Sequence, residues 1–465
     1  MSQATLAVPV APAPAERVLP AGTRALLEAP ILPTLLRLAA PNVVVVAVQA
    51  VSSAFDAFFV GRLGADALAG VSLVFPLWML MVTTSAGGMG GGIASAIARA
   101  LGAGKRAEAN ALVAHALVIG VIMAAVFSAG ALLGGPALYG AMGGSGATLA
   151  AALAYSNLIF GGAIAVWLLN VLASTLRGTG QMTFPAVVIV GGELLHLVLA
   201  PTLIFGLGPF PALGVTGAGI SQVTACTLRA LALATYLLAG RSVLSLTAIP
   251  FRPRRVLFWE ILRVGLPASV NTVLSSVNVM AATGLVGTFG TFALAGYGVG
   301  ARLEYLQIPI VFSIGTALVT MVGTSIGAGQ VARARRVAWV GTALAAAVTG
   351  GIGLLAALVP WVWIGLFSSE PAVLATGETY LRIVGLAYGF FGAGMALYFA
   401  GQGAGRLFWP LVAAFARLFV TVGGGWIAVR WLGGGLPALF TAIALAFAVL
   451  ATIQVAAMKA NVWQR

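Results

Sequence analysis

The sequence predicts an all-α integral membrane protein of twelve transmembrane helices, arranged as two six-helix lobes related by a pseudo-two-fold axis along the membrane normal. Three observations predict this architecture. The 465 residues are 61% hydrophobic and only 7% charged, with a mean hydropathy of +1.07, whereas soluble domains are about 25% charged. Apolar stretches of about 20 residues, long enough to span a bilayer, recur along the chain. Four short motifs also occur twice, in the same order.

Clusters of Gly, Pro and Arg separate the apolar stretches and mark where each helix is expected to begin and end. In the first lobe the helices are expected at 34–63, 67–98, 110–135, 149–172, 183–206 and 215–240. In the second lobe they are expected at 260–288, 292–323, 335–363, 374–400, 407–430 and 436–458.

This pattern divides the chain into four parts. Residues 1–30 are rich in Ala and Pro and lack the continuous apolar core of a cleavable signal peptide, so a disordered cytoplasmic tail is expected there. The N-lobe is expected at 31–240, a cytoplasmic linker at 241–259 and the C-lobe at 260–465. The single cysteine, Cys226, excludes an internal disulfide.

Positive charges test the helix count, because cytoplasmic loops are enriched in Lys and Arg. These residues gather in the loops after the even-numbered helices, while the loops after the odd-numbered helices carry few. The residues concerned are Arg99, Lys105, Arg106, Arg177, Arg241, Arg252, Arg254, Arg255, Arg263, Arg333, Arg335 and Arg336. We therefore expect a multi-pass membrane protein with both termini in the cytoplasm. The net charge of +14 then reflects topology, and no nucleic-acid partner is expected.

The repeated motifs indicate an internal duplication. VGRLGADALAG at Val60 recurs as VGTFGTFALAG at Val286, an offset of 286 − 60 = 226. Pro41 matches Pro267 at the same offset, while LGAG at 101 and RGTGQMTFP at 177 recur 225 residues later as IGAG and QGAGRLFWP. Six helices per repeat give both halves the same orientation. Transporters use parallel repeats of this kind, although a duplication can also simply stabilise a bundle.

Four ionisable side chains inside the expected spans are singled out as candidates: Asp56, Glu193, His196 and Glu304. Such side chains are costly in a bilayer unless paired or hydrated, so each is a functional candidate with a structural ion pair as the alternative. Glu193 and His196 are three residues apart and share one face of the fifth helix. Asp56 is expected at a similar depth on the first helix, so these three residues are expected to form one cluster.

Glu304 lies near the middle of the eighth expected helix. It could serve as a second-lobe cation or substrate site, or it could form an interhelical salt bridge. Arg302, two residues away, points to a different side of the helix and need not be its partner.

Other residues at depth are candidates for the walls of a substrate cavity: Tyr155, Asn157, Asn271 and Asn278, together with Glu304. In helix bundles such Asn residues are often structural, with interhelical hydrogen bonds of about 0.6 kcal/mol. Two histidines and one cysteine give no recognisable metal site. The GAGKR segment at Gly102 lacks the first glycine of a phosphate-binding loop, so neither a cofactor nor direct ATP drive is expected.

From about Leu35 onward, the order of these motifs resembles the multidrug and toxic compound extrusion (MATE) family of cation-coupled exporters. The resemblance rests on LAAPN in the first helix, on an acid followed by VGRLG and ALAG, on the two GAG loops, and on RGTGQMTFP with its repeat. It implies a V-shaped pair of six-helix lobes. Such proteins export organic cations and other amphipathic compounds against an inward flow of protons or sodium ions.

The resemblance also implies roles for single residues. The family's coupling acid lies fifteen residues after the proline of the first helix, which here gives Asp56 (56 − 41 = 15). Pro41 should bend that helix, because proline removes a backbone hydrogen bond. The family's Asn and Asp on the fifth helix, in a segment like LNxxLDP, are replaced in LHLVLAP by His196 and Ala200, and Glu193 would supply the missing carboxylate.

The second lobe departs further from the family pattern. Ser275 and Ala393 stand where some members carry acids, so coupling is expected through the first lobe.

The sequence therefore predicts a secondary active exporter, not an enzyme. It would exchange amphipathic or cationic small molecules for protons or sodium ions by alternating access, with Asp56, Glu193 and His196 as the coupling residues. Sodium at Asp56 is the alternative to a proton. The expected protein is a monomer in contact with membrane lipids.

Two rival functions remain. One is a lipid-linked oligosaccharide flippase of a related superfamily, against which the helix count and the sparse intramembrane Arg argue. The other is a membrane-embedded enzyme that uses Glu193 and His196 as acid and base.

Overall fold

The computed structural model describes residues 19–245, 252–431, 433–460 and 463, and these residues form helices without any strand. Ten helical segments are long and apolar enough to cross a membrane, and a pair bent by 46° forms an eleventh. Helix α9 (Val215–Leu238) supplies the twelfth, and it is less apolar because it carries Gln222 and Arg229. The described residues thus contain the expected twelve spans.

The first six spans are α2 (Ile31–Gly61), α3 (Ala65–Thr83) continuing through Thr84–Met89 into α4 (Gly90–Gly102), α5 (Arg106–Ala141), the bent pair α6 (Gly146–Gly161) and α7 (Ala163–Gly178), α8 (Thr183–Phe205), and α9. The second six are α10 (Arg255–Gly287), α11 (Thr291–Gly327), α12 (Val331–Leu358), α14 (Pro371–Val384) continuing into α15 (Tyr388–Ala404), α16 (Phe408–Phe419) continuing into α17 (Gly425–Arg430), and α18 (Gly435–Lys459). The short α13 (Pro360–Ile364) follows α12.

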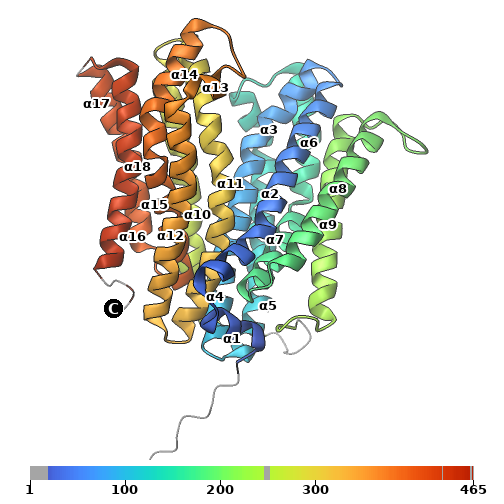
Figure 1. Cartoon of the computed structure of the whole chain (residues 1–465). Helices are drawn as coiled ribbons and strands as arrows, with labels where there is room; N and C mark the ends of the chain where they lie inside the picture. Colours follow the sequence, from blue (N-terminus) through green and yellow to red (C-terminus); the bar gives the residue numbers. More distant parts are fainter. Residues whose placement is uncertain (1–18, 246–251, 432, 461–462, 464–465) are drawn as a thin grey trace, which may run out of the picture.

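The two sets of spans lie side by side, one blue to green and the other yellow to red (Figure 1). Across the boundary α11 packs on α2 and α4, and α10 packs on α4 and on the Thr84–Met89 segment. Helix α1 (Ala21–Glu28) and the end of α18 lie at the same end of the molecule (Figure 1).

The prediction of a disordered tail over residues 1–30 is wrong for its last part, where α1 (Ala21–Glu28) forms. Residues 1–18 lie outside the described residues, but α1 is a helix that buries Thr23, Leu26 and Leu27. It is amphipathic and packs on α11. Arg333 of α12 donates hydrogen bonds to the carbonyl oxygens of Leu26 and Ala29, at 3.0 and 2.6 Å. These bonds satisfy carbonyl groups at the end of the helix that have no partner within it.

The ends of several spans also differ from those expected. Helix α10 begins at Arg255, so the last five residues assigned to the inter-lobe linker are helical, and 246–251 lie outside the described residues. Helix α5 has 36 residues, about 54 Å at 1.5 Å per residue, and so exceeds a hydrocarbon core of about 30 Å. Hydropathy marks only the apolar middle of such a helix, because its ends are polar.

The lobes touch through backbone at the end that carries α1. A side chain at Gly102 would place its Cβ 2.1 Å from the carbonyl oxygen of Thr324, and one at Gly327 would place it 2.0 Å from that of Arg99. Gly102 and Gly327 occupy the same place in the repeated LGAG and IGAG motifs. The duplicated glycines therefore let α4 and α11 approach more closely than any other residue would allow.

Polar contacts hold the same end closed. Arg99 of α4 forms a salt bridge with Glu260 of α10 at 3.1 Å, and it also donates a hydrogen bond to the Ser95 hydroxyl. That hydroxyl donates in turn to the carbonyl oxygens of Gln402 and Gly403 at the end of α15, at 2.6 and 3.0 Å. The closed end thus joins both lobes through a chain of side-chain and backbone bonds.

Candidate functional site

Asp56 and His196 meet inside the N-lobe, where α2 packs against α8. The Nε2 atom of His196 lies 2.9 and 3.1 Å from the two carboxylate oxygens of Asp56. An ionised carboxylate can only accept, so Nε2 carries the hydrogen in that state. The other ring nitrogen, Nδ1, is buried and has no hydrogen-bond partner among the described residues.

The two side chains of this pair differ in their access to solvent or lipid. The His196 side chain is 2% exposed, whereas that of Asp56 is 38% exposed. The carboxylate is therefore the accessible member of the pair, and the imidazole is its buried partner. Pro41 lies inside α2, fifteen residues before the acid.

Glu193 has a different partner from the one expected. Its carboxylate accepts a hydrogen bond from Nη1 of Arg229 on α9 at 2.5 Å, and both side chains are almost fully buried. Arg229 also donates to the Ala225 carbonyl oxygen at 3.1 Å and to the Cys226 sulfur at 3.3 Å. The three-residue cluster is therefore corrected: the structure describes an Asp56–His196 pair beside a separate Glu193–Arg229 ion pair.

Glycine at 192 makes the Glu193–Arg229 pair possible. A Cβ at Gly192 would lie 2.3 Å from the Cδ and Cγ atoms of Arg229, so the Arg side chain crosses α8 directly over this residue. Arg229 was missed in the sequence, although an Arg in the middle of an apolar span is itself a signal for a buried acidic partner.

Glu304 lies within the C-lobe near Tyr380 and Arg417. The Tyr380 hydroxyl donates to Oε2 of Glu304 at 3.2 Å, and Nη2 of Arg417 lies 3.8 Å from Oε1. Arg302 lies over the ring of Phe367, with 5.2 Å between its guanidinium carbon and the ring centroid, and so points elsewhere. The geometry matches the salt-bridge alternative for Glu304.

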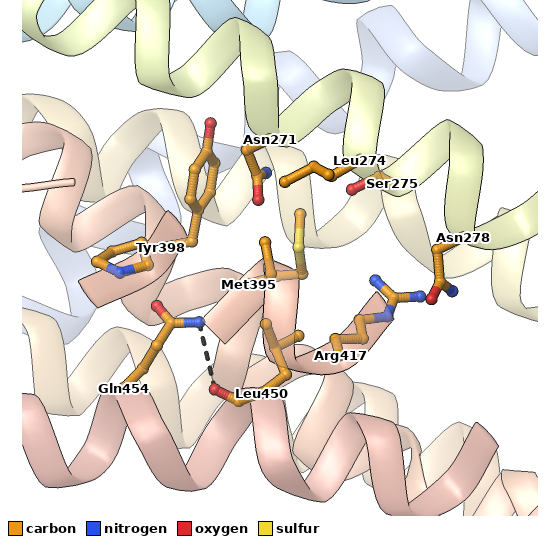
Figure 2. A pocket seen from close by; sticks show the side chains of 11 residues that line it. Asn271, Leu274, Ser275, Asn278, Met395, Tyr398, Arg417, Leu450 and Gln454 are labelled. Atoms are coloured by element: carbon orange, nitrogen blue, oxygen red, sulfur yellow. Dashed lines mark hydrogen bonds between the residues drawn. The ribbon is translucent and has the colours of Figure 1, made fainter. Parts of the chain in front are cut away.

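The four remaining cavity candidates lie in different places. Asn271 and Asn278 line a pocket within the C-lobe, which Arg417 and Gln454 also line (Figure 2). Tyr155 packs in the N-lobe against a cluster that includes Val60 and Ala200, each four residues after a member of the Asp56–His196 pair. Asn157 is exposed on α6. Neither Arg417 nor Gln454 was identified from the sequence.

A metal centre finds no support in the described part of the chain. No group of three or more His, Cys, Asp and Glu side chains there is placed to hold a metal ion.

Comparisons with known proteins agree with the architecture. The MatE family model matches residues 41–202 and again 267–427. The second match begins 226 residues after the first begins and ends 225 residues after the first ends. A FAD transporter of Shewanella oneidensis is 29% identical over 79% of this chain and 81% of its own. The multidrug resistance protein NorM of Burkholderia vietnamiensis is 26% identical, over 83% of this chain and 91% of its own.

A solved structure matches over almost the whole chain. It shows the outward-facing conformation of a multidrug resistance MATE family transporter, superposes with a TM-score of 0.86 at 25% identity, and covers 96% of this chain and 98% of its own. These matches confirm the twelve-helix fold class predicted from the sequence. With its two family-model matches and this fold, the chain belongs to the MATE family of multidrug efflux transporters.

Proposed function

We propose that this protein is a secondary active exporter that exchanges amphipathic small molecules for protons by alternating access. The observation that carries the proposal is the contact between Asp56 and His196. Two titratable groups within hydrogen-bond distance bind and release protons as a unit. Protonation of Asp56 changes the charge inside the N-lobe, and a charge change at such a site can bias two packings of a bundle.

A proton suits this pair better than a sodium ion. Sodium is a hard cation that prefers several oxygen ligands, as calcium and magnesium do. Here the imidazole edge of His196 faces both carboxylate oxygens of Asp56. An N–H in that position competes with a metal ion for the same oxygen lone pairs.

The orientation in the membrane follows from charge. The end that carries α1 also carries Lys105, Arg106, Arg333 and Arg336, and positive charge marks the cytoplasmic side. On this assignment both termini are cytoplasmic in a bacterial inner membrane. The closed end then faces the cytoplasm, as an outward-facing state requires.

The alternatives keep less support. A membrane enzyme using Glu193 and His196 as acid and base would need both groups at one substrate, but Glu193 is held by Arg229. A flippase for lipid-linked oligosaccharides would belong to another branch of the superfamily. Lipids remain the expected surroundings, a monomer the expected state, and no cofactor is required for ion exchange.

The test is transport by the purified protein in proteoliposomes, with a pH gradient or a sodium gradient imposed separately. Because one relative is named as a FAD transporter, the substrates tested should include an organic anion beside the amphipathic cations that the sequence predicts. We expect uphill movement of substrate with the pH gradient alone. Movement driven only by sodium would contradict proton coupling, and turnover of a covalent bond without either gradient would favour the enzyme.

A further inference from the structure

The C-lobe pocket is lined by amide and hydroxyl side chains, which can donate or accept hydrogen bonds, and by one positively charged residue. Asn271, Ser275 and Asn278 of α10 form one wall, and Arg417 of α16 and Gln454 of α18 lie opposite (Figure 2). No acidic residue is among the described residues that line it. The sign of this pocket is therefore opposite to that of the N-lobe site, whose formal charge comes from Asp56.

Arg417 is a buried cation with unused donors. The residue is 8% exposed, and its Nη2 atom lies 3.8 Å from the nearest carboxylate oxygen of Glu304, too far for a hydrogen bond. Its Nε–H has no partner among the described residues. A guanidinium has five N–H donors in its plane. Burial removes the water molecules that would bond to them, and few protein acceptors replace that water here, which costs free energy.

Aromatic rings stabilise the charge without using those donors. The guanidinium carbon of Arg417 lies 4.8 Å from the ring centroid of Phe447 and 5.9 Å from that of Phe391. A cation over a ring interacts with the π-face, whereas hydrogen bonds form at the edge of the guanidinium. The edge that faces Asn278 in Figure 2 remains available to an acceptor.

The neighbouring amides are also incompletely bonded. Oδ1 of Asn278 and Oε1 of Gln454 are buried without a hydrogen-bond partner in the described structure, while Nε2 of Gln454 donates to the Gly394 carbonyl oxygen at 3.0 Å. An unpartnered buried polar group costs about 1–3 kcal/mol. Of these three groups only the Nε–H of Arg417 is a donor; an incoming oxyanion would accept from it, and from Asn278 once that amide turns its NH2 toward the pocket.

We infer that this pocket binds the acidic head group of an amphipathic organic anion. Arg417 supplies the charge and Asn278 a second donor, while Leu274, Met395 and Leu450 contact the first apolar atoms of the ligand. The pocket is small in this conformation, so it receives the head group and the rest of the molecule extends beyond it. Export of such an anion rests on the proposed function. Its binding to this pocket is inferred independently of that function.

The competing explanation is purely structural. In it, Arg417 exists only to pair with Glu304, and the pocket holds water. The two explanations differ in what happens when Glu304 loses its charge. If Arg417 binds an anion, the affinity for that anion rises. If Arg417 only pairs with Glu304, the ion pair is lost and anion affinity does not change.

The experiment measures equilibrium binding to the full-length protein in detergent, without any ion gradient. The probes are benzoate, benzamide and benzylammonium, which have nearly the same shape and carry charges of −1, 0 and +1. We expect benzoate to bind at least about tenfold more tightly than either of the others, the ratio that one charge-assisted hydrogen bond provides. Equal affinities for benzoate and benzamide would overturn the inference.

Three variants assign the site. Glu304→Gln should tighten benzoate binding, because Arg417 loses its competing carboxylate. Glu304→Gln combined with Arg417→Gln should reduce it to the benzamide level, and the double change avoids leaving a buried carboxylate without its partner. Asn278→Leu should weaken it about threefold or more if its amide contributes one neutral hydrogen bond.

The matched control is Glu193→Gln combined with Arg229→Gln, which removes a buried ion pair of the N-lobe. Benzoate binding should be unchanged in this control, and each variant's melting temperature reports whether it folds. Unchanged benzoate binding in the Glu304→Gln, Arg417→Gln variant would place the ligand elsewhere and overturn the inference. Because no gradient is used, the result stands independently of how export is coupled.

Discussion

Six titratable side chains inside this bundle form three pairs, and the two members of each pair come from different helices. Asp56 on α2 meets His196 on α8, Glu193 on α8 meets Arg229 on α9, and Glu304 on α11 lies near Arg417 on α16. Each pair lowers the cost of placing a charge away from water. The pairs differ in exposure, since only the Asp56 carboxylate is substantially exposed. The Asp56–His196 pair is therefore the one of the three that is accessible from outside the bundle.

The Glu193–Arg229 pair should matter for stability. Glu193→Gln leaves the buried Arg229 without its carboxylate, and breaking one partner of a buried pair costs about 3–5 kcal/mol of the free energy of unfolding. Replacing both residues, with Glu193→Gln and Arg229→Met, should recover most of that loss. Denaturant unfolding in mild detergent measures both effects.

The control for this measurement is the exposed pair on α14. The Arg382 side chain is 56% exposed and that of Glu378 is 25% exposed, and such a pair within one helix is worth about 0.3–0.5 kcal/mol. Glu378→Gln should therefore change stability little. An equal loss in Glu378→Gln and Glu193→Gln would mean that burial of the N-lobe pair is not what makes it strong.

His196 should set the pH dependence of export. His196→Asn keeps an amide donor near Asp56 but removes the imidazole, a side chain that can gain or lose a proton. We expect the dependence of export on pH between about 5.5 and 8 to become flatter. Initial export rates at fixed gradient size, measured across this range, test the expectation.

The second histidine serves as the comparison. His115 accepts a hydrogen bond from the Arg254 backbone N–H at 2.9 Å and lies at the junction between α5 and α10, away from the pair. His115→Gln should preserve the shape of the pH profile. An unchanged profile in His196→Asn, or the same change in both variants, would show that His196 does not set the pH dependence of export.

At the scale of elements, the closed end depends on glycine at two duplicated positions. Gly102 of α4 and Gly327 of α11 allow each helix to touch the backbone of the other. The sequence predicted the duplication of these motifs but not their contact, because repeat offsets say which residues are equivalent and not which of them meet across the lobes. The same limit explains why α1 was expected to be disordered: its partners in α11 and α12 are distant in the chain.

Gly102→Val should open the closed end. The added side chain would collide with the carbonyl group of Thr324, so we expect the lobes to separate there and the population of this conformation to fall. Spin labels at Lys105→Cys and Arg336→Cys, one on each lobe, should report a longer distance by pulsed electron resonance. Cys226 is 3% exposed and can stay in place.

Gly130 of α5 provides the matched control. A Cβ at this position meets nothing within 4 Å, so Gly130→Val changes the same residue type within a helix without touching the other lobe. The label distance should stay as in the parent protein. An unchanged label distance in Gly102→Val would show that the close approach of α4 and α11 does not hold the end closed.

At the scale of the whole molecule, the protein is a duplicated bundle whose halves carry different ionisable side chains at their buried sites. Hydropathy, charge alternation and the repeat offset predicted the twelve spans, and the family resemblance, through its spacing from Pro41, pointed to Asp56. The meeting of Asp56 with His196 followed from helix direction and depth. The partners of Glu193 and Glu304 did not follow, because they depend on how each helix is rotated about its axis, and Arg229 is 36 residues away from Glu193 in the chain.

The different charges suggest a division of labour between the halves. The N-lobe holds a carboxylate–imidazole pair, and the C-lobe pocket holds a guanidinium with amides around it. Coupling is therefore expected in the first lobe, with Glu304 secondary to it.

The central claim is that Asp56 couples export to the proton gradient, and the most direct measurement compares two assays of Asp56→Asn in proteoliposomes. One follows uphill export driven by a pH gradient, and the other follows exchange of labelled for unlabelled substrate without a gradient. We predict that Asp56→Asn loses uphill export but keeps exchange, while Glu304→Gln keeps both. Uphill export by Asp56→Asn, or its loss in Glu304→Gln with normal folding, would contradict the account and place coupling outside the Asp56–His196 pair.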